Sequence, residues 1–311
     1  MMSILTFHAV TDRDWFENLI SWLRSRCRFV PIESVAAYYA NGGCSGKLCH
    51  ITVDDGDKSF ADVIFPVLRK HGVHSSLFVS PRSAVVGGNF WFQEIGGCDE
   101  GVLRYIAARV LKVPVQLLSG HSPEVILKTM PLSQIDKVID GYRESTNGRS
   151  KASQNLSASA IQELASTGLV SIGAHTKNHP ILANEDYTTC ETEIAGSVRD
   201  LSSLLGRRVE YFAYPNGIPG MDFGDREERF LRDSGISLAF STESRHLSKR
   251  DRALRIPRLA ISNRETMPHI MAKMLLGTNW DRAKRIAGVS EYVQRGRLIR
   301  TLNGFRHMDA S

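Results

Sequence analysis

Two adjacent carboxylates follow a short apolar segment in the stretch HITVDDGDKS, residues 50–59. Ile51 and Val53 alternate with polar positions as in a buried strand, which ends at Asp54, Asp55 and a glycine. Two buried ionised carboxylates would repel each other, so one must be neutralised by a cation or take up a proton. A bound metal ion meets this requirement most directly. The alternative is a Gly-containing turn in which aspartate serves only because it tolerates turn geometry.

A pair of histidines could supply the other ligands of such a metal. His175 and His179 stand four residues apart in IGAHTKNHP, directly after a second short apolar segment. If the intervening chain turns helically, this spacing places both imidazoles on one side. Two histidines and one carboxylate leave coordination positions open for water and substrate, as a catalytic metal site requires.

The composition is that of a soluble globular protein, with 311 residues, 42% of them hydrophobic and 23% charged. No apolar run approaches the length of a membrane span, and the N-terminal segment reaches Asp12 before the apolar region of a signal peptide could form. The five cysteines are odd in number and lie outside any C-x-x-C spacing, which favours reduced thiols. We therefore expect a cytoplasmic protein.

The positive charge is concentrated at the C-terminal end. Of the net charge of +6, residues 263–311 contribute +5, from nine Lys/Arg and four Asp/Glu. The nearly neutral remainder argues against nucleic-acid binding by the main body. Residues 267–276 and 280–299 mix apolar and basic side chains, which suits a helix in peripheral contact with an anionic membrane. The alternatives are a solvated helical face, or helices that dock on the rest of the chain or on a second subunit.

Segments with strand and helix patterns alternate along most of the chain, which predicts an α/β barrel with its active site at the carboxyl ends of the strands. The expected strands are residues 3–10, 47–53, 74–79, 169–174, 209–213, 236–240 and 254–261. The expected helices are residues 12–24, 32–40, 60–70, 158–167, 187–205 and 226–233. Between about 81 and 157 the alternation breaks, and three helical pieces at 102–111, 123–130 and 133–143 indicate an insertion that ends in a polar linker. No nucleotide-binding glycine pattern is present.

Three motifs occur in a fixed order: Asp54-Asp55-Gly56, His175-x-x-x-His179, and FAYPNG at residues 212–217. Together with the flanking segments LTFHAV and RIPRLAI, they resemble the NodB-like polysaccharide deacetylases, carbohydrate esterase family 4. The resemblance spans residues 3 to 262. It implies a distorted (β/α) barrel for residues 1–262, including the insertion at about 81–157, and a basic helical extension at residues 263–311.

The resemblance also implies roles for the first two motifs. A divalent metal, usually zinc in that family, would be held by Asp55, His175 and His179. Asp54 would be the base that takes a proton from the water attacking the N-acetyl carbonyl. The metal ligand and the base would thus be two neighbouring carboxylates with separate roles.

In the third motif, the resemblance implies that the backbone N–H of Asn216 stabilises the oxyanion and that Tyr214 and Pro215 shape the substrate wall. Many members carry an arginine where this chain has Ala213, as in the subgroup written F-A-Y-P. Arg258 of RIPRLAI is our candidate to replace that arginine beside the base. The alternative is an ordinary surface or structural arginine.

Two further positions are candidates for substrate chemistry. The family's late histidine, which protonates the leaving amine, has no clear counterpart, and His8 at the end of the first expected strand could take its place as the general acid. A satisfied core histidine is the alternative. Trp91 and Phe92 in the insertion could stack on sugar rings, or they could pack the insertion's own core.

These residues predict a metal-dependent hydrolase that removes an N-acetyl group from an amino sugar in a polysaccharide, glycolipid or glycan precursor. The same groups could hydrolyse another C–N bond, such as an N-formyl or cyclic amide. A carbohydrate-binding module that has lost turnover is a further alternative. Only the basic tail suggests nucleic-acid binding, and no aromatic-basic motif supports it.

Overall fold

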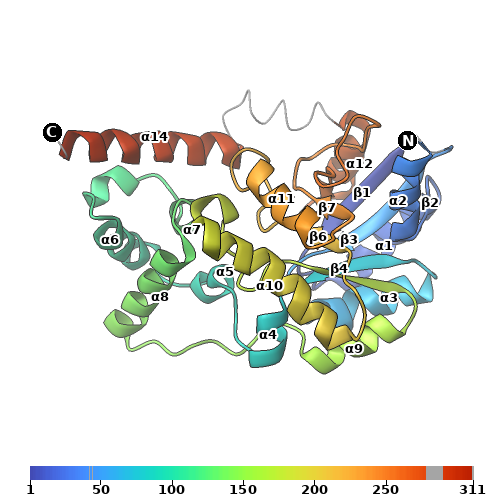
Figure 1. Ribbon diagram of the computed structural model, residues 1–311, viewed down its shortest axis with the longest axis horizontal. Helices are drawn as coiled ribbons and strands as arrows, with labels where there is room; N and C mark the ends of the chain where they lie inside the picture. Colours follow the sequence, from blue (N-terminus) through green and yellow to red (C-terminus); the bar gives the residue numbers. More distant parts are fainter. Residues whose placement is uncertain (42, 44, 278–289, 310–311) are drawn as a thin grey trace.

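The computed structural model of the chain describes residues 1–41, 43, 45–277 and 290–309. Its centre is a parallel sheet with the strand order β7-β6-β5-β4-β3-β1-β8, in which β2 pairs with the start of β3 (Figure 1). The strands are β1 (Met2–Phe7), β2 (Arg28–Phe29), β3 (Leu48–Val53), β4 (Ser75–Val79), β5 (Val170–Ala174), β6 (Tyr211–Ala213), β7 (Leu238–Phe240) and β8 (Leu259–Ala260).

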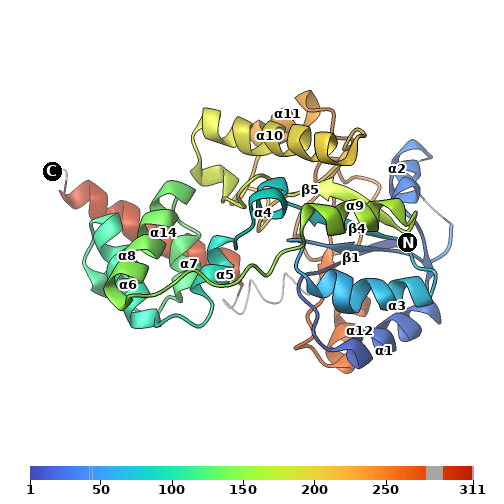
Figure 2. The ribbon, with the colours of Figure 1, turned by 90° about the horizontal axis from the view of Figure 1, so that it is seen from below.

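Helices cover both sides of this sheet, as parallel strands require because they are buried on both faces. Every residue of β1, β3 and β4 is buried. In Figure 2, α1 and α3 lie on one side of the sheet, and α10 and α11 lie on the other. The helices of this part are α1 (Arg13–Arg24), α2 (Ile32–Ala40), the π-helical turn η1 (Phe60–Ile64), α3 (Phe65–Lys70), α9 (Ala158–Ser166), the short turn η3 (Leu182–Asn184), α10 (Tyr187–Leu205), α11 (Asp225–Asp233) and α12 (Met267–Leu276).

The two end strands of the sheet, β7 and β8, do not pair with each other in the described part of the chain. Ile256 forms a single parallel bridge with Phe240 at the end of β7, and Leu259 and Ala260 then pair with β1. One short segment therefore spans the opening between the two edges. This curled parallel sheet with its surrounding helices confirms the prediction of a distorted (β/α) barrel.

The segment between β4 and α9 forms a helical body beside the barrel (Figure 1). It has an apolar core of its own, which includes Leu103, Ile126 and Ile135. Leu298 and Leu302 of the C-terminal helix complete this core. The elements are α4 (Pro81–Val86), α5 (Trp91–Ile95), α6 (Glu100–Leu111), η2 (Val115–Leu118), α7 (Pro123–Leu127), α8 (Leu132–Thr146) and the C-terminal α14 (Glu291–Asp309).

Each C-terminal helix buries part of its apolar face inside the protein, although Leu275 and Leu276 of α12 are exposed. Ile270 of α12 is fully buried in the barrel core, and Leu298 of α14 is fully buried against the insertion. Across the described residues, no helix combines the length and apolarity that a membrane crossing needs. The packing of Ile270 and Leu298 matches the docked alternative, and peripheral membrane contact stays a prediction. Three basic residues of the second segment, Arg282, Lys284 and Arg285, lie outside the described residues.

Local sequence signals set several element boundaries as expected. The hydroxyl of Ser157 accepts a hydrogen bond from the N–H of Ala160 and so begins α9, and α10 has the predicted bounds. The last strands are shorter than predicted: residues 254–261 contribute only the two-residue β8. In this stretch Arg255 forms an ion pair with Glu228. Arg258, just before β8, forms an ion pair with Asp54 in the active site.

His50 on β3 gives the fold a pH dependence. Its ring is buried between the carbonyl of Val30, 2.8 Å from Nδ1, and the hydroxyl of Ser76, 2.9 Å from Nε2. Burial lowers the pKa of His50 to about 4.

Because the unfolded chain takes up this proton near pH 6.5, the unfolded state binds more protons between about pH 6.5 and 4, and stability falls as the pH drops through that window. We expect a loss of about 3 kcal/mol across it from this residue. Urea unfolding of the wild type and of His50→Gln at pH 7 and pH 4.5 measures the contribution as a difference of differences. A His50 that titrates near pH 6.5 in the folded protein by NMR would contradict it.

Candidate active site

The carboxyl ends of the parallel strands bring distant residues to one edge of the sheet. Asp54 and Asp55 follow β3, His175 follows β5, and Asn216 follows β6. They line a cavity of about 450 Å³, whose other walls come from the loops after β1 and β7, from α5 and α7, and from the start of α14. The insertion and the C-terminal helix therefore contribute to the same cavity as the barrel.

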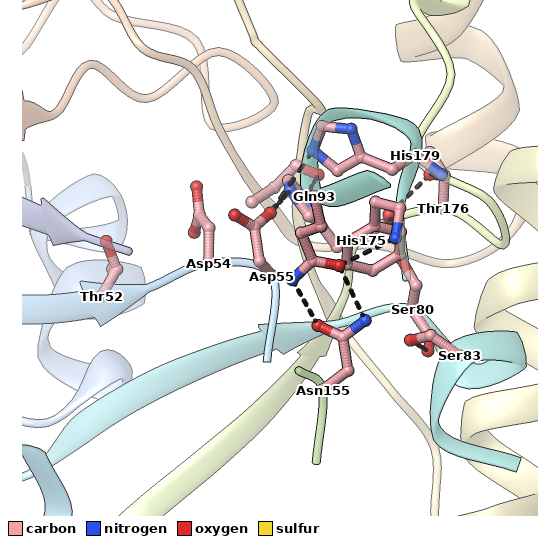
Figure 3. A network of polar contacts seen from close by, with 12 residues as sticks. Thr52, Asp54, Asp55, Ser80, Ser83, Gln93, Asn155, His175, Thr176 and His179 are labelled. Atoms are coloured by element: carbon pink, nitrogen blue, oxygen red, sulfur yellow. Dashed lines mark hydrogen bonds and ion pairs between the residues drawn. The ribbon is translucent and has the colours of Figure 1, made fainter. Parts of the chain in front are cut away.

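Asp55, His175 and His179 form a cluster suited to a metal ion. Oδ1 of Asp55 lies 3.4 Å from Nε2 of each histidine, and all three residues are buried. In Figure 3 the Asp55 carboxylate lies between Asp54 and the two imidazoles. Two ligand atoms, each bound to a tetrahedral zinc ion at a normal bond length, lie about 3.4 Å apart. The spacing therefore fits a divalent cation held by these three side chains.

The hydrogen bonds around this cluster leave the ligand atoms available. Nδ1 of His175 lies 2.7 Å from the carbonyl oxygen of Ala213, to which it donates, so that the lone pair of Nε2 faces Asp55. Oδ1 of Asp55 is buried without a hydrogen-bond partner among the described residues. A buried carboxylate oxygen without a donor is costly, which a cation at this point would correct.

The segment between the two histidines is not helical, so the condition under which the spacing would align their imidazoles is not met. Thr176 and His179 both adopt left-handed backbone conformations, with φ of 61° and 57°. The chain folds back as a tight loop, and the two imidazoles nevertheless come together with ring centroids 4.9 Å apart. The two imidazoles are thus brought together by a loop with left-handed residues and not by a helical turn.

A buried carboxylate on α10 holds this histidine loop. Oε2 of Glu193 accepts hydrogen bonds from the backbone N–H groups of Lys177 and Asn178, each at 2.9 Å, and Glu193 is only 4% exposed. From the other side, the hydroxyl of Ser80 donates to the carbonyl of His175 at 2.9 Å. Glu193 was not singled out from the sequence, because its partners are backbone groups 15 and 16 residues earlier in the chain.

The insertion is tied directly to the metal cluster. The indole N–H of Trp91 donates to the carbonyl of His179 at 3.1 Å. Gln93 and Asn155 form a pair of reciprocal amide hydrogen bonds (Figure 3), and the chain next to Asn155 bonds back to Gly56 through the N–H of Leu156. The start and the end of the insertion are therefore both anchored beside the catalytic loops.

Trp91 does not offer the stacking face that we predicted. It borders the cavity, but it is only 3% exposed and packs in the core of the insertion. Phe92 is the more accessible neighbour, because it is half-buried, lines the cavity and contacts the ring of His179 edge-on at 4.9 Å. Of the two aromatic residues predicted from α5, Phe92 rather than Trp91 is therefore open to a ligand.

Asp54 has a partner of its own. Nη1 and Nη2 of Arg258 donate to the two carboxylate oxygens of Asp54, each at 2.7 Å, and neither residue is more than 1% exposed. The guanidinium is fixed in turn by the carbonyl of Ser241 at 2.9 Å and the hydroxyl of Thr52 at 3.2 Å. Arg258 is thus neither a surface residue nor remote from the site, and it places a cation beside Asp54 where Ala213 cannot.

The surroundings favour the charged form of both carboxylates. Burial opposes ionisation of Asp54, but the Arg258 guanidinium and the nearby His175 outweigh it and lower the pKa of Asp54. For Asp55, burial is likewise outweighed by the two facing histidines, and its pKa lies well below the usual range. The two adjacent carboxylates therefore have different partners: Asp54 faces the Arg258 guanidinium, and Asp55 faces the two histidines.

Tyr214 and Pro215 do not form the substrate wall, contrary to our expectation. Tyr214 is fully buried, with its ring stacked on Phe223 at a centroid distance of 3.6 Å and its hydroxyl donating to the carbonyl of Leu254. Pro215 is also buried, and neither residue borders the cavity. Ile218 and Pro219, a few residues later, line it instead.

Asn216 is the residue of this turn that reaches the cavity. It has a φ of 56°, a conformation that asparagine tolerates better than most residues, and its carbonyl accepts a hydrogen bond from the hydroxyl of Thr242 at 2.5 Å. Its side-chain Nδ2 is buried without a hydrogen-bond partner in the described part of the protein. The turn thus presents an unused donor near the proposed metal ligands.

His8 also lines the cavity, and its side chain is exposed, so the alternative of a satisfied core histidine is wrong. Sequence reasoning missed the more distant wall, to which Glu124 and Lys128 contribute from the insertion and Glu291 and Tyr292 from the C-terminal helix. No local motif marks these residues, because they meet the cavity only through tertiary packing.

One protein family matches the part of the chain that contains the histidine loop and the turn of Asn216. The family described as polysaccharide deacetylase matches residues 132–229, a span that contains His175, His179 and Asn216. Over these residues the chain is similar to the polysaccharide deacetylase domain. The prediction of an enzyme of the carbohydrate N-deacetylase class is confirmed at this level, whereas the F-A-Y-P subgroup stays a prediction.

Solved structures share the fold. IcaB from Ammonifex degensii is 21% identical with a TM-score of 0.59, over 88% of this chain and 96% of that one. The Streptococcus pyogenes deacetylase PplD, in complex with acetate, is 18% identical with a TM-score of 0.59, over 88% and 97%. A de-N-acetylase from Aggregatibacter actinomycetemcomitans is 15% identical with a TM-score of 0.56, over 88% and 99%. No curated protein matches the chain.

The cluster predicts how zinc content responds to substitution. His175→Ala and Asp55→Ala should bind far less zinc than the wild type, because each removes one of three ligands. Asp54→Asn should keep its zinc, since Asp54 is occupied by Arg258. Mass spectrometry after equilibration with zinc measures the content, His121→Ala serves as the control, and circular dichroism checks the fold. Full zinc stoichiometry in His175→Ala would show that the ion binds elsewhere.

Proposed function

We propose that the protein is a metal-dependent de-N-acetylase that acts on an N-acetylated amino sugar in a polysaccharide, a glycolipid or a glycan precursor. The observation that carries this proposal is the separation of roles at the end of β3: Asp55 faces two histidines, and Asp54 faces Arg258. A hydrolase of this kind needs one carboxylate for the metal and another that is free to accept a proton.

Each residue of the site has a place in this reaction. Asp55, His175 and His179 would hold the cation, which when bound supplies Lewis acidity toward the amide carbonyl. Asp54, kept ionised and oriented by Arg258, accepts the proton of the attacking water.

The departing amine must gain a proton as the C–N bond breaks. Among the described histidines of the cavity, His8 alone lies outside the ligand set, which makes it the candidate donor. Zinc is the proposed metal, because two imidazoles and one carboxylate are ligands that it accepts. The free thiols at the four described cysteines agree with the proposed cytoplasmic location.

The shape of the site limits the substrate. A cavity of about 450 Å³ lies in the range of small-ligand pockets, and half-buried Phe92 offers it an aromatic face. We infer that one N-acetylated residue and part of its neighbour enter the cavity while the rest of the glycan stays outside. An N-formyl or cyclic amide would meet the same groups in the cavity.

Acetate release from a panel of N-acetylated sugars, with N-formyl and cyclic amides for comparison, tests the proposal. Activity should require the metal, and Asp54→Asn should lower kcat by about 10²–10⁴ without loss of metal, because only proton transfer is removed. Asp62→Asn, an exposed carboxylate on η1, is the matched control. Near-normal turnover in Asp54→Asn would refute the assigned base, and inactivity of the wild type on every substrate would refute the function.

Asn216 allows its two donors to be tested separately. Asn216→Gly keeps the backbone N–H and the left-handed conformation, so it removes only the side-chain amide. We expect kcat to fall about tenfold or more with metal content unchanged, because the buried Nδ2 would no longer reach the oxyanion. Asn216→Asp, of the same shape but with a carboxylate, should be more impaired than the glycine variant. Equal kcat in the wild type and Asn216→Gly would leave the backbone N–H as the donor that Asn216 contributes.

A further inference from the structure

The turn that carries Asn216 is closed by a buried carboxylate. Oδ2 of Asp222 accepts the N–H of Ile218 at 2.8 Å, and the N–H of Asp222 donates to the carbonyl of Ile218 at 2.9 Å. Asp222 is only 1% exposed. Because Ile218 and Pro219 line the cavity and directly follow Asn216 and Gly217, the position of this carboxylate sets the shape of one cavity wall.

The partner of Asp222 comes from the far end of the chain. Nη1 of Arg295, on the C-terminal helix α14, lies 2.5 Å from Oδ1 of Asp222. Nη2 of Arg295 donates to the carbonyl of Lys128, directly after α7, at 2.9 Å. Arg295 is 1% exposed, so a single buried guanidinium joins the active-site turn, the insertion and the C-terminal helix.

The same helix contributes to the cavity itself. The carboxylate of Glu291 lies 3.0 Å from Nζ of Lys128, and both residues line the cavity, as does Tyr292. Glu291 also lies 3.4 Å from Nη1 of Arg295, one helical turn away. Helix α14 therefore lines the cavity through Glu291 and Tyr292 and also contacts, through Arg295, the turn that forms another wall.

The Arg295–Asp222 pair is costly to break from either side. Burial raises the pKa of Asp222, and the facing guanidinium counteracts this effect. Removing the arginine would leave a carboxylate with a single backbone donor in a water-excluded position. Either the turn would open toward water, or Asp222 would take up a proton, and the guanidinium would no longer fix the carboxyl group that holds Ile218.

We propose that Arg295 is a positioning residue for catalysis: through Asp222 it holds the turn of Asn216 to Asp222 in place, and it thereby makes the C-terminal helix part of the active site. This inference rests on the proposed function of the turn in the hydrolysis. A purely structural role, in which Arg295 only fastens α14 to the rest of the protein, predicts lower stability but an unchanged kcat in the folded enzyme.

The test compares Arg295→Met and Arg295→Lys with Arg297→Met, an exposed arginine on the same helix. In Arg295→Met we expect kcat to fall about 10- to 100-fold, because a small displacement of a catalytic group costs this much, while KM changes less and the zinc content is unchanged. Arg295→Lys, which retains the charge, should recover part of the loss. Arg297→Met should behave as the wild type. A normal kcat in folded Arg295→Met would overturn the proposal.

Amide hydrogen exchange of the peptide covering residues 214–224 gives a readout that needs no activity. Exchange at Ile218 should be faster in Arg295→Met than in the wild type and unchanged in Arg297→Met. Unchanged exchange in Arg295→Met would overturn the proposal even if no substrate were found. If only the proposed deacetylase function is wrong, the wild type will be inactive, but exchange at Ile218 will still be faster in Arg295→Met than in the wild type.

A double variant covers the case in which Arg295→Met does not fold. Asp222→Asn with Arg295→Met removes both charges and keeps an amide oxygen for the N–H of Ile218. If Arg295 positions the turn, this variant folds with the same zinc content but keeps a kcat about tenfold or more below that of the wild type. A normal kcat in the double variant would show that the pair serves only to balance charge, and the proposal would be wrong.

Discussion

The site depends on how two neighbouring carboxylates can both be charged inside a protein. Asp54 and Asp55 are consecutive and buried, and their mutual repulsion would be severe without counter-charges. The structure separates their partners: Arg258 takes both oxygens of Asp54, and the two histidines face Asp55. A left-handed backbone at Asp55, with a φ of 73°, turns the second carboxylate away from the first.

This separation requires the parallel sheet. Arg258 lies just before β8, which pairs with β1, and β1 pairs with β3, so that the arginine reaches the end of β3 across more than 200 residues of sequence. The glycine after the carboxylates completes the turn. Gly56 has a φ of 72°, and an added Cβ would lie 2.9 Å from a methyl carbon of Val79. The insertion and the C-terminal helix supply further walls of the cavity.

The sequence supported those predictions whose causes are local or periodic. The alternation of strands and helices gave the barrel, and the strand that ends in two carboxylates marked the centre of the site. Arg258 could be named because many members of the family that the chain resembles carry an arginine where this chain has Ala213. Backbone conformation was harder to predict. The histidine loop, for which we considered a helical turn, depends on Glu193 and on left-handed residues that its own sequence does not signal.

The predictions about side-chain direction failed for a related reason. Tyr214 and Trp91 carry polar atoms and stand near the site in sequence, yet both bury their rings and donate to backbone carbonyls. Which face of an aromatic residue meets solvent is decided by tertiary packing. The same holds for α14. Its Arg295 belongs to a basic stretch whose composition suggested a membrane-binding helix, but the side chain is buried and paired with Asp222.

The central claim is that Asp55 holds the metal while Asp54 stays with Arg258. Anomalous diffraction at the zinc edge, from crystals of the zinc-loaded protein, tests it most directly. We expect one strong peak within bonding distance of a carboxylate oxygen of Asp55 and of Nε2 of both His175 and His179, with Arg258 still paired to Asp54. A peak coordinated by Asp54, or no peak at these three residues, would contradict the account.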